Sequence, residues 1–289
     1  MSLLSPSLEA FWAVVQKGTV LEAAKTVSLT QTGVTQRIRS LEKQLGVTLF
    51  TRSRKGMRLT SEGESLLRYV QAARDLEGDT LEKISGRKSS TLIDICISST
   101  ASTMRSRILP RVGAVCKKHP QLRMNFDFTD PNGIVGKLKN GQALLAALPE
   151  NQVGLELDSK TMATERYILV GPAVWKRRRL SDILEKECPI SLSELEIPTA
   201  NLLTKYKLSK KVRRDKHQTN SLDALLAMVE QGLGYSVLTA ELAEPFLKKG
   251  SLINLDKSVY LEENLALAWY PRNEMPTYLK DLITALIKK

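Results

Sequence analysis

Four polar side chains and two arginines are spaced to occupy one side of a helix: Gln31, Thr32, Thr35, Gln36, Arg37 and Arg39. Four apolar side chains recur at helical intervals between them and predict the buried side: Val34, Ile38, Leu41 and Leu45. Amides and hydroxyls of this reach suit the edges of base pairs, and guanidinium groups suit bases or phosphates. The pattern therefore predicts a helix over residues 31–45 that presents a polar face to duplex DNA.

Basic residues cluster around a glycine shortly after this helix: Arg52, Arg54, Lys55 and Arg58. Gly46 is typical of a helix end, and residues 47–50 predict a strand that enters a hairpin with these cations at its tip. A positive two-stranded loop beside an exposed helix binds phosphate or enters a narrow minor groove. Merely solvated charges on a three-helix core are the alternative, but the ordered array of helix, turn, helix and basic hairpin favours DNA binding.

Local signals define the elements that must hold this face in place. Thr19 and Glu22 have the spacing of a capping box, which starts a short helix. Thr30 is suited to cap the polar-faced helix that follows. Preceded by a helix over residues 7–16, these elements predict a winged helix-turn-helix in residues 1–60.

A long helix is predicted over residues 61–84, with its apolar side chains along one stripe. Because this stripe is too long for a small head to cover, a matching helix of a second copy is the simplest cover and predicts a dimer. A dimer would place two such heads on successive major grooves, about 34–36 Å apart. Packing against the chain's own second part is the alternative. Residues 61–90 are interpreted as a linker and dimerisation helix followed by a hinge.

Residues 91–289 alternate between strand and helix patterns. Strands are predicted at residues 92–98, 123–129, 143–148, 166–171, 235–238 and 265–270, and helices at residues 102–118, 134–140 and 221–230. Pro110 is expected to bend or break the first of these helices. The alternation predicts an open α/β sheet.

Composition narrows the class of protein. The chain has 289 residues, enough for about two domains, and its net charge of +12 suits a polyanionic partner. It shows no secretory signal and no apolar run long enough to cross a membrane, and its three cysteines are widely spaced, so a cytoplasmic location is expected. His119 and His217 lie in no catalytic or metal-binding pattern, so we expect no enzyme activity, no metal and no cofactor.

The segments 23–24, 30–42, 45–52 and 59–63 resemble the LysR-type transcriptional regulators. Within them, Gln-Arg-Ile-Arg followed by Leu-Glu resembles the branch of arginine- and lysine-responsive members. The resemblance extends over nearly the full chain. It implies a sequence-specific regulator that works as a dimer or tetramer, with RNA polymerase as a possible further partner. It also implies that residues 91–289 form an effector domain whose two lobes resemble periplasmic binding proteins.

On this resemblance one lobe comprises residues 91–162 and 266–289, the other residues 163–265, and a small-molecule effector binds between them. Hydroxyl and amide groups at segment ends facing that crevice are the candidate effector ligands: Ser98, Ser99, Thr100, Thr103, Thr129, Asn201, Asn220 and Ser221. The first three precede a helix and would suit a carboxylate or phosphate. Each also has an ordinary role as a turn or cap residue.

Two other functions remain open from the residues alone. A solute-binding module of transport type would share the two lobes, but the N-terminal head counts against it. A DNA-binding protein without an effector is favoured only by two departures from the family pattern. Pro131 stands where the family commonly has a ligand-contacting serine or threonine, and residues 144–148 lack the usual Asp-Leu-Ala element.

Overall fold

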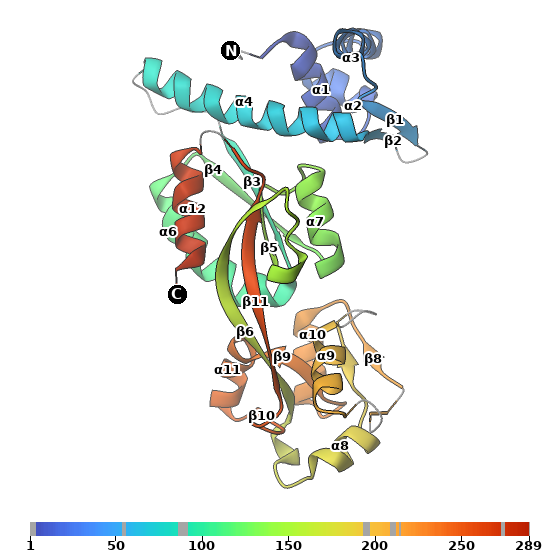
Figure 1. Cartoon of the computed structure of the whole chain (residues 1–289), viewed down its shortest axis with the longest axis vertical. Coiled ribbons are helices and arrows are strands. Elements are labelled where there is room, and N and C mark those ends of the chain that lie inside the picture. Colours follow the sequence, from blue (N-terminus) through green and yellow to red (C-terminus); the bar gives the residue numbers. More distant parts are fainter. Residues whose placement is uncertain are drawn as a thin grey trace.

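The fold consists of a head, a long helix and two lobes that follow one another along the longest axis of the molecule (Figure 1). It is taken from a computed structural model that describes residues 4–53, 56–85, 92–192, 197–208, 212–213, 215–272 and 275–288. The predicted linker at residues 85–90 therefore lies almost wholly outside the described residues. Within them, no helix has the length and apolar character needed to span a bilayer.

Three helices form the head: α1 (Pro6–Lys17), α2 (Val20–Thr26) and α3 (Gln31–Leu45). They pack around a buried cluster that includes Phe11, Val14, Ala23 and Val34. Ala23 is fully buried, and its small side chain allows α2 to lie close against its neighbours. This core fixes the direction of α3, which carries the predicted DNA-binding face.

The helix starts follow the predicted caps with one difference. The Thr30 hydroxyl accepts a bond from the Gly33 amide at 3.0 Å, which starts α3. The Thr19 hydroxyl accepts from the Glu22 amide at 3.3 Å. The Glu22 carboxylate, however, accepts from the Lys25 ammonium at 2.7 Å, so the reciprocal bond of the predicted capping box is replaced by an ion pair.

Leu45 was expected in the buried stripe of α3, and that prediction is wrong. Leu45 is 45% exposed, whereas Val34, Ile38 and Leu41 are buried. The helix ends immediately afterwards at Gly46, which adopts the left-handed conformation, and the chain turns away before Leu45 meets the core.

The wing consists of β1 (Phe50–Ser53) and β2 (Gly56–Leu59), paired antiparallel. The strand predicted from residue 47 begins only at Phe50. The Leu49 amide donates to the Glu42 carboxylate at 2.8 Å, and the Leu49 carbonyl accepts from the Thr60 amide at 3.0 Å. The backbone before β1 is therefore bonded to the end of α3 and the start of the next helix.

Helix α4 (Ser61–Ser85) starts under the wing and lies across the top of the first lobe (Figure 1). Its cap is Thr60, which accepts from the Gly63 amide at 3.0 Å. Leu67 and Val70 are buried in the core of the head. In the first half of α4, these apolar side chains are thus covered by the head of the same chain.

One mixed sheet connects both lobes, in the order β10-β6-β11-β5-β3-β4, with β9 also paired to β6. The first lobe holds the parallel strands β3 (Ile93–Ser99), β4 (Leu122–Phe128) and β5 (Leu145–Pro149). Helices α6 (Leu109–Lys118) and α12 (Thr277–Ile287) pack on one face of these strands and α7 (Pro131–Lys139) on the other.

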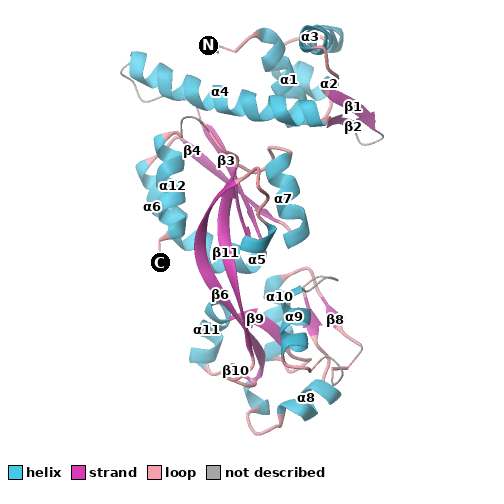
Figure 2. Cartoon of the chain, in the orientation of Figure 1, coloured by secondary structure: helices cyan, strands magenta, loops and turns pink. Residues whose placement is uncertain are grey.

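Two long strands, β6 (Asp158–Pro172) and β11 (Tyr260–Trp269), run from the first lobe into the second (Figure 2). Their register shifts between Leu265 and Ala266. The predicted division between the lobes, at residues 162/163 and 265/266, lies beside this irregularity and stays a prediction.

The second lobe adds short strands and four helices around this shared ribbon. The strands are β7 (Ile190–Ser191), β8 (His217–Gln218), β9 (Ser236–Thr239) and β10 (Leu252–Asn254). The helices are α8 (Leu180–Lys186), α9 (Ile197–Lys205), α10 (Leu222–Glu230) and α11 (Ala240–Lys249). Single-turn 3-10 helices follow β5 and β6: η2 (Glu150–Gln152) and η3 (Ala173–Trp175).

The helix expected around Pro110 is interrupted in a specific way. It comprises α5 (Ala101–Thr103), a π-helical turn η1 (Met104–Ile108), and α6, with Pro110 in the first turn of α6. Proline has no amide hydrogen to bond the preceding turn, so the wider turn accommodates it without breaking the helix. This π-helical turn carries Arg105 and Arg107 toward the second lobe.

Candidate nucleic-acid interface and ligand cleft

The exposed face of α3 carries the side chains predicted to contact DNA. Gln31, Thr32, Gln36 and Arg39 are exposed, opposite the buried stripe of the same helix. Thr35 is half-buried, and its hydroxyl donates to the Gln31 carbonyl at 2.9 Å. Because α1 and α2 hold this helix on its apolar side, its polar side is free to enter a major groove.

Arg37 is held within the protein. Its Nη1 donates to the Pro6 carbonyl at 3.3 Å, and the side chain is half-buried. Pro6 is the first residue of α1, so this bond connects α3 to the start of the first helix. The geometry gives Arg37 a role in orienting α3, beside the contact with DNA that was predicted.

The wing carries part of the predicted basic cluster. Arg58 is exposed on β2, and Arg52 lies on β1, where its backbone pairs with Met57. Arg54 and Lys55, and the side chain of Arg52, lie outside the described residues. A cation on such a hairpin gains affinity by neutralising phosphate and releasing counterions.

Helix α4 connects the head to the first lobe through three polar contacts. The Gln71 amide donates to the Gly141 carbonyl at 2.7 Å, and Arg68 donates to the Lys139 carbonyl at 3.3 Å. The Arg68 guanidinium also lies 4.6 Å from the centre of the Tyr270 ring. These contacts set the orientation of the DNA-binding head relative to the effector domain.

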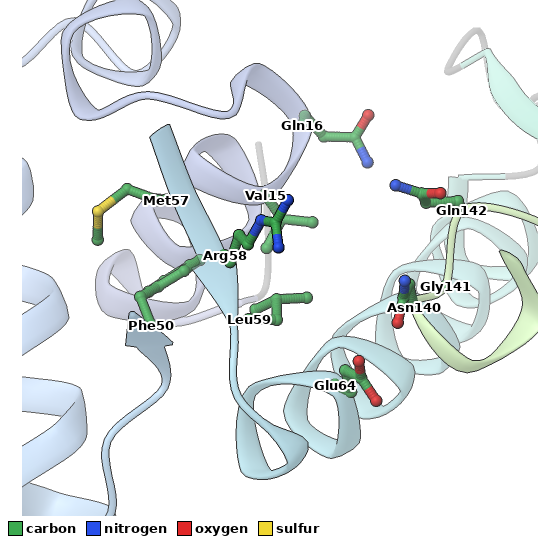
Figure 3. A pocket seen from close by; sticks show the side chains of 10 residues that line it. All are labelled: Val15, Gln16, Phe50, Met57, Arg58, Leu59, Glu64, Asn140, Gly141 and Gln142. Carbon is green, nitrogen blue, oxygen red and sulfur yellow. The ribbon is translucent and has the colours of Figure 1, made fainter. Parts of the chain in front are cut away.

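A cavity of about 780 Å³ opens beside these contacts, between the head and the first lobe. Figure 3 shows Gln16 of the head and Gln142 of the lobe extending toward each other across it, with Arg58 and Glu64 also on its wall. The junction is therefore packed along α4 and open along the wing.

A second, smaller cavity of about 60 Å³ lies between the two lobes. Its wall is built from α5 and its cap, β5, η2, the shared strands β6 and β11, and α9: Thr100, Thr103, Ala147, Leu148, Pro149, Asn151, Gln152, Glu165, Tyr167, Pro198, Asn201, Glu263 and Leu265. Three of these were predicted as effector ligands: Thr100, Thr103 and Asn201. We call this cavity the ligand cleft.

Two carboxylates dominate the ligand cleft, and neither was predicted. Glu165 on β6 is only 3% exposed, and burial raises the pKa of its carboxyl. It accepts hydrogen bonds from Thr103 at 3.1 Å and from the Tyr167 hydroxyl at 2.8 Å. Glu263 on β11 is the direct cross-strand partner of Glu165 and accepts from the Asn201 amide at 3.4 Å.

Like charges directly opposite each other on neighbouring strands are destabilising. A buried carboxylate is also costly unless a cation or several donors compensate it. Within the protein, Glu165 is compensated by the hydrogen bonds from Thr103 and Tyr167 and by the Arg107 guanidinium, whose Nε lies 3.7 Å from its Oε1 atom. The expectation of a carboxylate or phosphate ligand at Ser98, Ser99 and Thr100 stays a prediction.

The other predicted effector ligands do not line the ligand cleft. Ser98 and Ser99 are fully buried, and their hydroxyls donate to the Asp127 carboxylate at 2.8 Å and to the Ala147 carbonyl at 3.2 Å. The Thr129 hydroxyl also donates to Asp127. These hydroxyls are occupied by contacts within the first lobe.

Asn220 and Ser221 are exposed at the start of α10. The Ser221 hydroxyl accepts from the Ala224 amide at 3.3 Å, which is the ordinary role of a helix cap. The sequence offered no distinct signal for Glu165, because its neighbours Thr164 and Arg166 are also polar and the pattern does not show which residue of β11 it faces.

Thr100 has the same capping role as Ser221 but lies in the ligand cleft. Its hydroxyl accepts from the Thr103 amide at 3.4 Å and donates to the Thr103 hydroxyl at 3.1 Å. Thr103 in turn donates to Glu165, so the two threonines form a short relay that ends on the buried carboxylate. No cluster of potential metal ligands occurs in the described part of the chain.

Comparison with known proteins identifies both parts of the chain. Residues 6–64 match the bacterial regulatory helix-turn-helix protein model of the lysR family, and residues 90–289 match the LysR substrate binding domain. Among curated proteins, the regulator ArgP of Aeromonas salmonicida is 24% identical and covers 89% of this chain and 87% of its own length. LysG of Mycobacterium bovis is 26% identical over 86% of this chain and 82% of its own.

Solved structures share the fold over the full length. The ArgP structure from Mycobacterium tuberculosis has a TM-score of 0.81 at 22% identity and covers 99% of this chain and 97% of that one. Full-length LysG from Corynebacterium glutamicum with bound effector Arg has a TM-score of 0.71 at 20% identity, over 98% and 97%. The two family models match consecutive parts of the chain, a DNA-binding head followed by a ligand-binding domain, and together they cover most of the sequence. The chain therefore belongs to the LysR family of DNA-binding transcriptional regulators.

Proposed function

We propose that this regulator responds to a small molecule with a cationic group, of the class of basic amino acids, bound in the ligand cleft. The observation that carries the proposal is the placement of Glu165, a buried carboxylate on β6 that lies directly opposite Glu263 on the adjacent strand β11. A bound guanidinium or ammonium group would compensate both charges, with the stronger hydrogen bonds that charged partners make. The effector arginine in the LysG structure of Corynebacterium glutamicum belongs to this chemical class.

The neutral groups of the ligand cleft suit the rest of such a molecule. Asn201 and Gln152 offer amide groups and Thr100 a hydroxyl, on segments that come from both lobes. A ligand that bridges these segments binds only when the lobes are near each other. It therefore shifts the population toward the closed arrangement by its difference in affinity for the two.

On DNA, we propose that Gln31, Thr32, Thr35, Gln36 and Arg39 contact base edges, with Arg37 holding α3 in position. The basic residues of the wing bind phosphate or the minor groove: Arg52, Arg54, Lys55 and Arg58. The division follows the exposure of the polar face of α3 and of Arg58 on β2.

Self-association completes the proposed function. Tyr69 and Leu76 are 59% and 53% exposed on a face of α4 that the head does not cover, whereas Leu67 and Val70 of the same helix are buried in the core of the head. A second copy that covers this face forms a dimer with two recognition helices, and a tetramer forms from two such dimers. A protein of this kind acts on chromosomal DNA in the cytoplasm, where RNA polymerase is a further partner.

The experiment that tests the effector class is calorimetric titration of the full chain with L-arginine and with its neutral isostere L-citrulline. Wild-type protein is expected to bind arginine and to discriminate against citrulline. Glu165→Gln is expected to lose about 2 kcal/mol of arginine affinity, a factor of about 30, since hydrogen bonds to charged groups contribute about 1.5–3 kcal/mol. Equal binding of arginine and citrulline by the wild type would overturn the proposal.

A further inference from the structure

Arg107 is a buried cation that lies behind the wall of the ligand cleft. Its side chain is 8% exposed, and it belongs to the π-helical turn η1. It does not line the cavity, but its Nε lies 3.7 Å from the Oε1 atom of Glu165, which does. The Glu165 carboxylate therefore has a cation of the protein, Arg107, on the side away from the cavity.

The guanidinium of Arg107 is divided between two carboxylates. Its Nη2 is bonded to Glu241 in the first turn of α11. Its Nε is beyond hydrogen-bond distance of Glu165 and has no hydrogen-bond partner among the described residues. Arg107 thus donates to Glu241, and its interaction with Glu165 is electrostatic only.

The helix that carries Arg107 is also a contact between the lobes. Ser102 and Thr239 share a hydrogen bond of 3.3 Å, and Arg105 pairs with Asp223 at 2.5 Å. Both partners belong to the second lobe, as does Glu241. A change in the partner of Arg107 therefore changes one of the polar links between the lobes.

We propose that Arg107 is the internal counter-ion of the ligand cleft, and that a bound cationic effector replaces it at Glu165 and leaves it paired with Glu241 alone. This inference rests on the proposed effector class. It assigns to Arg107 and Glu241 a role in setting effector affinity although neither side chain lines the cavity.

The physical reason is competition between like charges for one carboxylate. An effector cation at Glu165 and the guanidinium of Arg107 repel each other across a buried region, where screening by water is weak. Glu241 offers Arg107 a second acceptor that is already bonded and 45% exposed. The guanidinium can thus move its charge away from Glu165 by a rotation of its own side chain.

The hypothesis predicts opposite effects for the two partners. Arg107→Gln removes the competing cation and is expected to tighten arginine binding about tenfold. Glu241→Gln leaves Arg107 with Glu165 as its remaining partner and is expected to weaken arginine binding by about the same factor. The double variant is expected to match Arg107→Gln, because Glu241 acts only through Arg107.

The measurement is calorimetric titration of the full chain with L-arginine, at one pH that is the same for every variant. Arg105→Gln is the matched control: it lies on the same π-helical turn and pairs with Asp223 of the second lobe, without contacting Glu165. Its arginine affinity is expected to equal that of the wild type.

If Arg107→Gln and Glu241→Gln change arginine affinity in the same direction, the role of Arg107 is merely structural and the inference is overturned. Additive changes in affinity in the double variant would also overturn it. If Arg107→Gln does not fold, Glu241→Gln decides alone, and unchanged or tighter binding overturns the inference. These outcomes leave arginine binding by the wild type intact. Failure of the wild type to prefer arginine over citrulline overturns the proposed effector class itself.

Discussion

Replacing Gly63 by alanine tests how α4 is seated under the wing. Alanine is favoured over glycine in a helix by about 1 kcal/mol. At Gly63, however, the added Cβ would lie 2.2 Å from the Leu49 carbonyl oxygen and 2.9 Å from the Leu59 side chain. Because a backbone oxygen cannot move aside alone, the helix and the wing must separate.

The magnitude follows from these contacts. Overpacking costs about 1–3 kcal/mol, and the separation weakens the bond from the Thr60 amide to the Leu49 carbonyl, worth about 1 kcal/mol. After subtraction of the gain in helix propensity, Gly63→Ala is expected to destabilise the head by about 1–3 kcal/mol.

Gly33→Ala is the matched control because Gly33 also lies within a helix of the head. Its added Cβ would lie 3.3 Å from the Thr30 hydroxyl, a side-chain atom that can adjust by a few tenths of an ångström. The propensity gain then prevails, and the head is expected to gain about 0.5 kcal/mol.

Hydrogen exchange of peptides from α3 and the wing measures the local opening free energy in the full chain. Protection is expected to fall in Gly63→Ala and to rise slightly in Gly33→Ala. Equal changes in the two variants would refute the steric argument, since propensity alone treats both glycines alike.

Three further predictions concern function and pH. Gln36→Ala should relax base preference by about 1–3 kcal/mol at one operator position; selection from random duplexes checks this, and uniform weakening on all sequences would contradict a base contact. Arg58→Ala should weaken binding on all sequences and flatten its dependence on salt; an unchanged slope in a salt titration would remove the wing from the interface. Burial raises the folded-state pKa of Glu165, so its contribution to stability is present below about pH 4.5 and is lost as the pH rises through the raised value. In thermal unfolding, Glu165→Gln should therefore gain stability relative to the wild type as the pH rises above about 4.5. A difference in stability between variant and wild type that does not change with pH would exclude a cost of ionising the buried carboxyl.

The head was largely predictable because its determinants are local. The cap at Thr30 and the apolar spacing of Val34, Ile38 and Leu41 lie within a few turns of one helix. Three details differ from prediction: Glu22 pairs with Lys25 and does not complete the capping box, Leu45 is exposed, and the strand β1 begins only at Phe50. Leu45 is 45% exposed at the end of α3, and the backbone at Leu49 is bonded by Glu42 and Thr60. Both depend on contacts with other elements, which periodicity does not contain.

The sequence by itself determined the order of the domains, the polar face of α3 and the resemblance to a family of regulators. Only the tertiary structure decided which polar residues meet between the lobes. Ser98 and Thr103 are similar hydroxyls in neighbouring segments, yet one bonds Asp127 within its lobe and the other bonds Glu165 in the ligand cleft. Glu165 and Glu263 come together because β6 and β11 pair across a separation of nearly a hundred residues. Such long-range pairing is set by how strands and helices pack, so the charge of the cleft emerges only in the folded chain.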